Sequence, residues 1–240
     1  MTAVSIRNLS KEFAGRPVLD SIDLEIAANQ FVCLFGASGS GKTTLLNLIA
    51  GLECADTGHI GIEATAKGDG RVGYVFQNPR LLPWRTVLEN ICLCLPTPGE
   101  ALDAQTLLET VGLWAFRDHY PERLSVGMRR RVALVRAFAV HPDLLLMDEP
   151  LVSLDAPTAR TIRTLTLDLW QARPHTVLYV THDLDEALEL GDRVVFLSSS
   201  PAKILCNAAI EIPRGQRSAE AIQAFKSQLL RQHPALAPLI

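Results

Sequence analysis

A glycine-rich run carries the residue types best suited to binding phosphate. It reads Gly36-Ala-Ser-Gly-Ser-Gly-Lys42-Thr43-Thr44 and matches the pattern GxxxxGK followed by Ser or Thr. It lies between the apolar run Phe31–Phe35 and a helical pattern that starts near Thr43. Glycine lets the backbone turn its N–H groups inward, and the helix start adds partial positive charge. The residues that we expect to cradle the phosphates are Gly36, Ala37, Ser38, Gly39, Ser40, Gly41, Lys42, Thr43 and Thr44.

Two residues of this run have additional roles. The Lys42 ammonium can reach the β- and γ-phosphates of a nucleotide, and the Thr43 hydroxyl is placed to ligate Mg²⁺. The alternative is a strand-to-helix turn that binds no ligand. The complete match, in the expected strand-to-helix context, favours a nucleotide site.

A second motif places two carboxylates at the end of an apolar strand. It reads Leu144-Leu-Leu-Met-Asp148-Glu149-Pro150. Asp148 suits Mg²⁺, directly or through water, and Glu149 can polarise an attacking water as a general base. Alone, the pair could equally be an exposed turn or a helix start. Together with the glycine-rich run, it predicts binding and hydrolysis of a nucleoside triphosphate.

Composition and charge exclude several other classes of protein. The 240 residues are 48% hydrophobic and 20% charged, which is typical of a globular protein with a core and not of a disordered chain. The formal net charge of −3 argues against bulk electrostatic binding to nucleic acid. Because no apolar run reaches the roughly 18–20 residues of a membrane span, we expect the chain to dock on a membrane protein rather than to cross the bilayer. The start of the sequence shows no secretory signal.

The five cysteines do not suggest a disulfide framework. Their number is odd and their spacing irregular, so we expect free thiols, a reducing cytosol and a packing role for each. Cys92 and Cys94 form a pair, but no second Cys or His pair lies near it to complete a metal site.

Short apolar runs alternate with helical patterns along the chain. This alternation predicts an α/β domain with a largely parallel sheet, which would position the motifs at strand ends. The expected strands are Val4–Ile6, Val18–Ile26, Phe31–Phe35, Val72–Phe76, Leu144–Met147, Val177–Val180 and Val194–Leu197. The expected helices are Thr43–Ala50, Ala101–Val111, Arg129–Val140 and Ala219–Gln232. We predict one domain: an α/β core over residues 1–82 and 143–212, a helical insert over 83–142, and a helical tail over 213–240.

Four further motifs follow one another in a recognisable order. They are Gln77 after a strand, the segment Leu124-Ser-Val-Gly-Met128, the segment Ser153-Leu-Asp155, and Thr181-His182-Asp183. Over about residues 2–212 the chain resembles the ATP-binding subunit of ABC transporters. The segments Phe76–Trp84 and Thr86–Asn90 resemble the nitrate/sulfonate/taurine branch of bacterial importers. The resemblance implies a P-loop NTPase core with a mostly parallel sheet, an N-terminal antiparallel β part and a helical insert subdomain.

In that family, two subunits pair head to tail around two ATP molecules. The resemblance therefore implies a homodimer or a paired ATPase subunit, in which the loop Leu124–Met128 of one chain caps the ATP of the other. Ser125 would supply a hydroxyl and Gly127 would allow close backbone approach. Ser125 could also be a simple helix N-cap, and both roles can hold together.

The resemblance implies roles for four other residues. Gln77 would sense Mg²⁺ or the attacking water, and His182 would contact the γ-phosphate and orient the water near Glu149. Asp155 would lie across the dimer interface. Phe13 would stack on the adenine ring, with plain packing as the alternative. The implied catalytic residues are Glu149, His182, Gln77 and Lys42, and the implied metal ligands are Thr43, Gln77 and Asp148.

The resemblance also implies partners and a location. The loop Asn78–Trp84 and the helical insert would grip transmembrane permease subunits, which work with a periplasmic solute-binding protein. Trp84 is either part of that surface or a core anchor of the insert. The chain would lie at the cytoplasmic face of the inner membrane as a peripheral subunit, with no nucleic-acid partner.

The sequence departs from the family pattern in one loop. Val126 stands where the family usually has glycine, and a β-branched residue restricts the backbone. Valine is tolerable if φ is negative at this position, and we expect that it is. The following run Arg129–Arg131 spreads over different faces of a helix, and we interpret it as a solvated face rather than a nucleic-acid patch.

Three other functions stay open at this point. One is a non-transport ABC ATPase, although such proteins usually carry two cassettes or a long insertion. Another is a weakly hydrolysing regulatory subunit, because of Val126. The third, a metabolite kinase, does not require Leu124–Met128 or His182. The imported solute also stays open among nitrate, sulfonates, taurine and thiamine-pyrimidine precursors.

Overall fold

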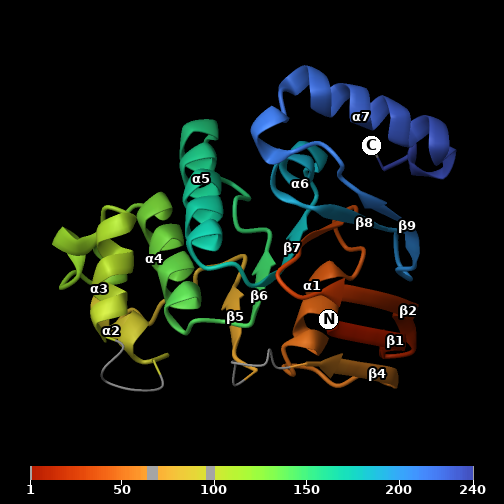
Figure 1. Ribbon diagram of the computed structural model, residues 1–240. Coiled ribbons are helices and arrows are strands. Elements are labelled where there is room, and N and C mark those ends of the chain that lie inside the picture. Colours follow the sequence, from red (N-terminus) through yellow and green to blue (C-terminus); the bar gives the residue numbers. More distant parts are fainter. Residues whose placement is uncertain (1, 64–69, 96–100, 240) are drawn as a thin grey trace. The chain divides into compact units, whose positions relative to one another are not determined.

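The computed structural model describes residues 2–63, 70–95 and 101–239. The chain forms two compact units (Figure 1), the first from Met1–Thr65 with Thr176–Ile240 and the second from Ala66–His175. The predicted division at residues 83 and 142 is a different one and stays a prediction. Each unit is described by itself below.

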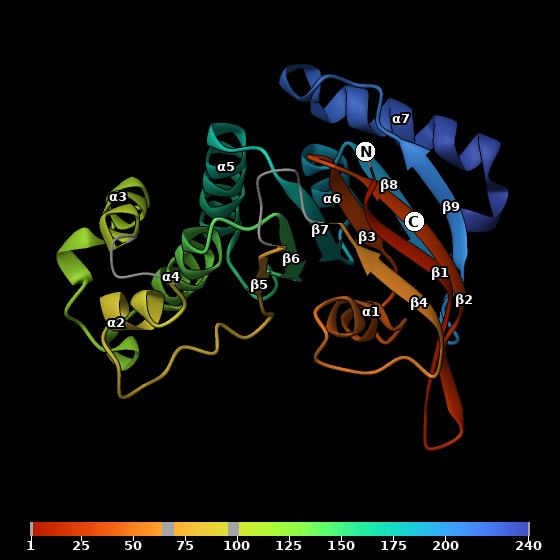
Figure 2. The ribbon, with the colours of Figure 1, turned by 60° about the horizontal axis from the view of Figure 1, so that its bottom comes forward.

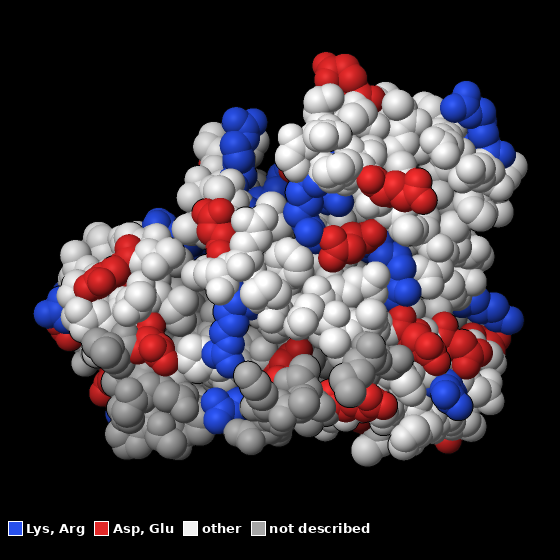
Figure 3. Space-filling model, viewed as in Figure 1, with Lys and Arg blue, Asp and Glu red and all other residues white. Residues whose placement is uncertain are grey.

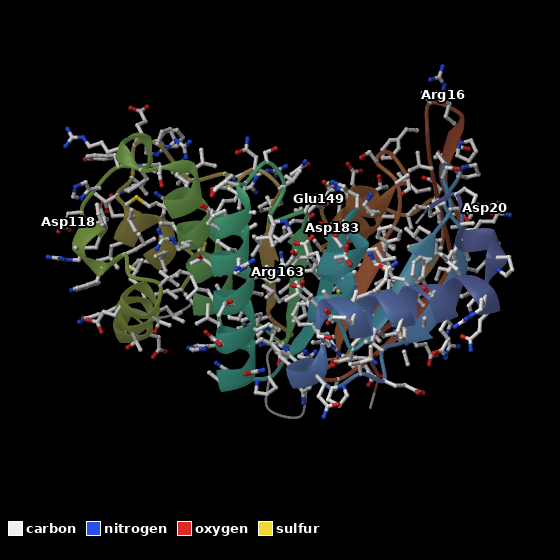
Figure 4. All side chains as sticks on the ribbon, turned by 90° about the horizontal axis from the view of Figure 1, so that it is seen from above. Arg16, Asp20, Asp118, Glu149, Arg163 and Asp183 are labelled. Atoms are coloured by element: carbon white, nitrogen blue, oxygen red, sulfur yellow. The ribbon has the colours of Figure 1, made fainter. Side chains whose placement is uncertain are left out.

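The first unit begins with an antiparallel sheet of strands β1 (Thr2–Phe13), β2 (Arg16–Ala27) and β4 (Thr57–Ile62), in the order β2-β1-β4. Arg16 lies at the tip of the β1–β2 hairpin (Figure 4). The sequence pattern missed β4, because its glycines weaken a strand signal. The structure explains Gly58, whose φ is +88°, since a Cβ there would lie 2.3 Å from the Asn8 carbonyl oxygen.

The second sheet of this unit holds strands β7 (Thr176–Thr181), β3 (Phe31–Phe35), β8 (Arg193–Leu197) and β9 (Ile204–Ala209) in that order. The first three are parallel and β9 is antiparallel to β8. Every residue of β3 and β7 is buried, as expected of parallel strands covered on both faces. The sequence missed β9, in which Cys206 is the one buried residue.

Helices α1 (Lys42–Ile49), α6 (Leu184–Leu190) and α7 (Ala219–Gln232) complete the first unit. Figure 2 shows α7 running beside β9, and its bounds are those predicted for the tail helix. The tail is tied to α6, because Lys226 pairs with Asp185 at 2.6 Å and Arg217 donates to the carbonyls of Leu188 and Glu189. Helix α6 starts two residues after His182, so the tail anchors the helix that follows this candidate site residue.

The second unit pairs strands β5 (Val72–Val75) and β6 (Leu144–Asp148) in parallel. Its helices are α2 (Val87–Cys92), α3 (Ala101–Thr110), α4 (Val126–Ala139) and α5 (Ala156–Ala172). Helix α4 packs between α3 and α5 (Figure 1) and buries its apolar side in one core with α2 and α3. No strand occurs in residues 83–95 and 101–142, as predicted, whereas α5 was not predicted.

Short 3₁₀ turns join several of these elements, at Trp114–Phe116, Pro121–Arg123, Arg214–Gln216 and Pro234–Leu236. Lysine and arginine side chains alternate with acidic ones over the face drawn in Figure 3. In the part of the chain that the structure describes, no helix has both the length and the apolar character of a membrane span.

All five cysteines are free, as predicted. The expected packing role is wrong for Cys54 and Cys94, which are exposed, and holds for Cys33 and Cys206, which are buried. Burial raises the pKa of the Cys33 thiol, and the nearby charge of Glu186 raises it further.

Candidate active site

The glycine-rich loop joins β3 to α1, and its shape depends on glycine at three positions. Gly39 and Gly41 have φ values of +79° and +87°, a region that other residues enter only with strain. A Cβ on Gly41 would lie 2.9 Å from Leu19 Cδ2, and one on Gly36 would lie 2.9 Å from Ser40 Oγ. A side chain at either position would therefore distort the loop.

The interior of this loop is polar. Lys42 is buried, and its ammonium donates to the carbonyls of Gly36 (2.9 Å) and Ala37 (2.8 Å). Ser40 Oγ is buried without a hydrogen-bond partner in the described structure, and no side chain caps the first turn of α1. A cation, a buried hydroxyl and uncapped helix N–H groups suit the oxygens of a phosphate group. Ala37, Ser38 and Gly39 are exposed, so a ligand has access to the loop.

The loop with His182 leaves the same edge of the same sheet. Phe35, the last residue of β3, pairs with Thr181, the last residue of β7. Because the strands are parallel and adjacent, Gly36 and His182 follow them side by side. The first unit therefore brings together two of the predicted motifs, and the His182 side chain is exposed.

A buried carboxylate holds the loop of His182. The Glu186 carboxylate accepts hydrogen bonds from the hydroxyls of Tyr179 and Thr181. Thr181 Oγ1 in turn accepts from the backbone N–H of Asp183 at 3.0 Å, and Asp183 caps α6. His182 thus stands between two residues whose positions are both set by this network.

The second unit brings together the other two strand-end motifs. Val75 pairs with Met147 in the parallel strands β5 and β6, so Gln77 and Asp148 follow neighbouring strands at one edge. Gln77 is exposed and Asp148 is buried. Burial first, and then the Asp148 charge, raises the pKa of Tyr74 well above its usual value.

Glu149 has an unusual backbone conformation. It follows β6 directly (Figure 4) and has a φ of +42°, in the left-handed region. Such a conformation costs a non-glycine residue about 1–3 kcal/mol and is concentrated at functional sites. The residues on either side of Glu149, Asp148 and Pro150, are both buried, whereas Glu149 is partly exposed.

Two arginines of α4 hold the loop that follows Gln77. Arg130 Nη1 donates to the Gln77 carbonyl. Arg136 donates to the carbonyls of Arg80 (2.9 Å) and Pro79 (2.7 Å). The interpretation of the arginine run as a solvated face is wrong for Arg130, because its side chain is 8% exposed and donates to the Gln77 carbonyl.

A buried asparagine holds the next part of the loop. Asn90 on α2 accepts from the Leu82 N–H at 2.7 Å, and its Nδ2 donates to the carbonyls of Leu82, Arg85 and Thr86. The loop carries Trp84, which is 69% exposed, so this residue is not a core anchor of the helical region. Beside the loop lies a cavity of about 400 Å³, lined by Asn78, Pro79, Arg80, Leu81, Pro83, Pro121, Glu122, Val126, Arg129 and Arg130.

Ser125 is the N-cap of α4, and its hydroxyl accepts from the Met128 N–H at 3.2 Å. Its predicted role toward ATP stays a prediction. Val126 is the first residue of the helix and has no positive φ, which confirms that valine is tolerated there. Gly127 is close to α5, because a Cβ there would lie 2.8 Å from Thr158 Cγ2.

Asp155 and Phe13 are both exposed. Asp155 caps α5 by accepting from Thr158 N (3.2 Å) and Oγ1 (2.9 Å), and these hydrogen bonds lower its pKa. Phe13 is 44% exposed, with the Lys11 ammonium 5.1 Å from its ring centroid. Its exposure disfavours the packing alternative, and stacking on adenine stays a prediction.

Three residues that support these loops, Glu186, Asn90 and Arg130, were not predicted as such from the sequence. Each lies inside a helix, where a polar residue normally faces water. Only burial and backbone partners distinguish them, and neither is visible in one sequence. In the described residues, no group of three or more His, Cys, Asp or Glu side chains could hold a metal ion by itself.

Comparison with known proteins gives consistent matches over most of the chain. A family model described as "ABC transporter" matches residues 19–152. The aliphatic sulfonates import ATP-binding protein SsuB 1 of Pseudomonas fluorescens is 43% identical, over 95% of this chain and 86% of its own. The protein of that name from Cupriavidus necator is 42% identical, over 98% of this chain and 79% of its own.

Solved structures match as well. A dimeric ATP-binding cassette in a post-hydrolysis state, bound to ADP and Pi, has a TM-score of 0.75 and 29% identity, covering 88% of this chain and 100% of that chain. A nucleotide-free ATP-binding cassette from an ABC transporter has a TM-score of 0.76 and 25% identity, covering 95% and 96%.

The network around His182 generates a first prediction. Thr181→Val keeps the side-chain shape but removes the hydroxyl, so Glu186 loses one donor and the Asp183 N–H loses its acceptor. We expect a loss of about 1–3 kcal/mol in the free energy of unfolding, measured by urea denaturation, because buried polar groups are left unpaired. Thr181→Ser keeps the hydroxyl and should lose clearly less. Equal stability of the valine and serine variants would contradict the network.

Proposed function

The chain belongs to the ABC transporter family of ATP-binding proteins, and on this premise we propose that it is the ATP-hydrolysing subunit of an importer for aliphatic sulfonates or a similar small solute. The predicted family and α/β fold class are confirmed. The observation that carries the proposal is the pairing of strand ends. It sets the phosphate loop beside His182 in one unit and Gln77 beside Asp148 in the other.

The phosphate loop binds the triphosphate in this proposal. Its N–H groups, Lys42 and the start of α1 neutralise the phosphate charge, and Phe13 offers an exposed ring to adenine. The polar interior of the loop and the buried Ser40 hydroxyl fit such a ligand. Lys42 donates hydrogen bonds to two carbonyls of the loop, and these bonds hold its ammonium group at the loop.

Glu149 acts as the general base that accepts a proton from the attacking water. His182 donates a hydrogen bond to the γ-phosphate and orients the water, while Gln77 senses it. Oxygen groups of Thr43, Asp148 and Gln77 would hold Mg²⁺, as suits a hard cation. In that position the metal would supply positive charge to offset the negative charge of the phosphate oxygens.

Two copies, or two paired subunits, complete the catalytic assembly. Ser125 and Gly127 of one subunit contact the nucleotide held by the phosphate loop of the other. The dimeric cassette with ADP and Pi among the similar structures supports this arrangement. Both residues lie at the start of α4, where helix N–H groups favour an anion, and Ser125 is exposed.

The membrane partner is proposed to dock at the cavity beside Trp84. Trp84 is exposed on a loop that also lines a cavity of about 400 Å³, and such a surface is unusual for an isolated domain. The partner would be a permease that works with a periplasmic solute-binding protein, and this subunit would lie at the cytoplasmic face of the membrane. The relatives are named as sulfonate import proteins, and these names favour a sulfonate among the possible solutes. In this proposal the cassette itself does not contact the solute.

Uptake of a labelled aliphatic sulfonate tests this function directly. Cells that lack the gene should lose uptake, and the wild-type gene should restore it, whereas a Lys42→Ala gene should not. Taurine and nitrate serve as competing solutes. Normal sulfonate uptake in the deletion strain would contradict the proposed solute.

Glu149→Gln should separate binding from hydrolysis. The amide keeps the side-chain shape but cannot accept the proton, so kcat should fall by about 100-fold or more while ATP still binds. Light scattering with ATP and Mg²⁺ should then show a stable dimer. Glu63→Gln, at an exposed position after β4, is the matched control. Turnover of Glu149→Gln at the control rate would refute the role of Glu149 as base.

Val126→Gly tests the alternative of a weakly hydrolysing regulatory subunit. Because Val126 is helical and half-exposed, glycine should change kcat by less than about twofold and the free energy of unfolding by about 0.5 kcal/mol. The measurements are phosphate release and urea denaturation. A rise in kcat of about tenfold would instead support the regulatory alternative.

A further inference from the structure

Arg130 is a buried cation with unusual partners. It is 8% exposed, and the described structure gives its guanidinium two backbone carbonyl acceptors and no carboxylate. Its Nε is also buried without a hydrogen-bond partner. Burying an arginine without an ion pair is costly, and burial lowers the pKa of Arg130. A residue kept at such a cost, where a neutral side chain would pack, points to a role other than stability.

The two carbonyls belong to two different loops. Arg130 Nη1 donates to Gln77, and Nη2 donates to Val152 at 3.3 Å. The first loop follows β5 and carries the Gln77 side chain. The second follows β6 and runs from Glu149 to Asp155. Because β5 and β6 are adjacent and parallel, the loops leave one edge, and the arginine joins them there.

The guanidinium is well suited to fix a distance. It is planar and presents its donors in a rigid fork, unlike the flexible ammonium of lysine. Both loops lack a strand or helix partner at these carbonyls, so the fork replaces the missing backbone hydrogen bonds. Arg130 thereby connects both loops to helix α4, whose first residues follow Ser125.

The neighbouring arginines do different work. Arg131 donates to the Val111 carbonyl at 2.8 Å, at the end of α3, and so ties helix to helix. Arg129 lines the cavity beside Trp84 but donates to neither loop. Arg131 therefore serves as the control, because it lies one residue away, carries the same charge and donates to a carbonyl outside the two loops.

We propose that Arg130 is a positioning residue for ATP hydrolysis, which holds the Gln77 loop and the Glu149–Asp155 loop in register with helix α4. The inference rests on the proposed function, because it takes Gln77 and Glu149 as the groups that act on the water and the nucleotide. A movement of α4 must then carry both loops with it. The loop that faces the membrane partner and the loop of the general base respond together.

The test uses the full chain and four variants: Arg130→Met, Arg130→Gln, Arg130→Lys and Arg131→Met. Methionine fills a similar volume without donors, glutamine keeps one donor group, and lysine keeps the charge. Arg130→Met should lower kcat by about tenfold or more, since small displacements at a catalytic site cost up to about 100-fold. KM for ATP should change little. Arg130→Lys and Arg130→Gln should recover part of kcat, and Arg131→Met should stay within about twofold of wild type.

The Mg²⁺ dependence distinguishes positioning from plain stability. If Arg130 acts through Gln77, the Mg²⁺ concentration for half-maximal turnover should rise in Arg130→Met, and it should rise likewise in Gln77→Ala. The double variant should then lose less than the sum of the two single losses in log kcat. Circular dichroism and urea denaturation establish that each variant is folded. If Arg130→Met does not fold, Arg130→Gln replaces it in the cycle.

Two results would overturn the proposal. One is a kcat of Arg130→Met within about twofold of Arg131→Met. The other is full additivity with Gln77→Ala together with an unchanged Mg²⁺ dependence. A failure of the proposed function looks different. The wild-type chain would then bind ATP without hydrolysing it, or Gln77→Ala would turn over at the wild-type rate.

Discussion

A buried polar backbone group must find a hydrogen-bond partner, and this constraint shapes every candidate loop of the molecule. Loops lack the regular pairing of helices and strands. Here single side chains supply it: Lys42 for the phosphate loop, Arg130 for the Gln77 loop, Asn90 for the Trp84 loop and Thr181 for the His182 loop. Two of these four are charged types, which a core accepts only when they are well paired. The supports are therefore as specific as the groups they hold.

Several candidate site residues are exposed, in contrast to the buried side chains that support the loops. Thr43, Gln77, Ser125, Asp155 and His182 are exposed in the single chain. The segments that carry Thr43 and His182 follow strands β3 and β7, in which every residue is buried. Exposed polar groups on rigid supports suit a site that binds a ligand at the surface, because little ordering then has to occur on binding.

Helix α4 connects most of these features within the second unit. Ser125 and Gly127 lie at its start and Arg130 lies in its middle. Arg136, near its end, donates to the Pro79 carbonyl in the loop that lines the cavity. Gly127 also lies close to Thr158 of α5, so α4 contacts the helix that Asp155 caps. A helix is a rigid element, so a displacement at one end reaches these partners together. Val126 does not disturb the arrangement, because the helix needs only a negative φ there.

The sequence by itself determined where the candidate chemical groups lie relative to strands and helices. The glycine-rich loop, the Asp148–Glu149 pair at a strand end and the tail helix Ala219–Gln232 follow from local rules of φ, hydropathy and spacing, and the structure has each where it was expected. Local rules failed where signals were weak, as in β4 with its glycines and in β9 with one buried residue.

Only the tertiary structure decided which residues support the site. Helical spacing made Arg130 look solvated and left Trp84 undecided, yet the first is buried and the second exposed. The register that sets Phe35 beside Thr181, and Val75 beside Met147, joins segments far apart in the sequence. Burial and strand register are properties of the whole packed chain, since each depends on neighbours that no local stretch of sequence contains.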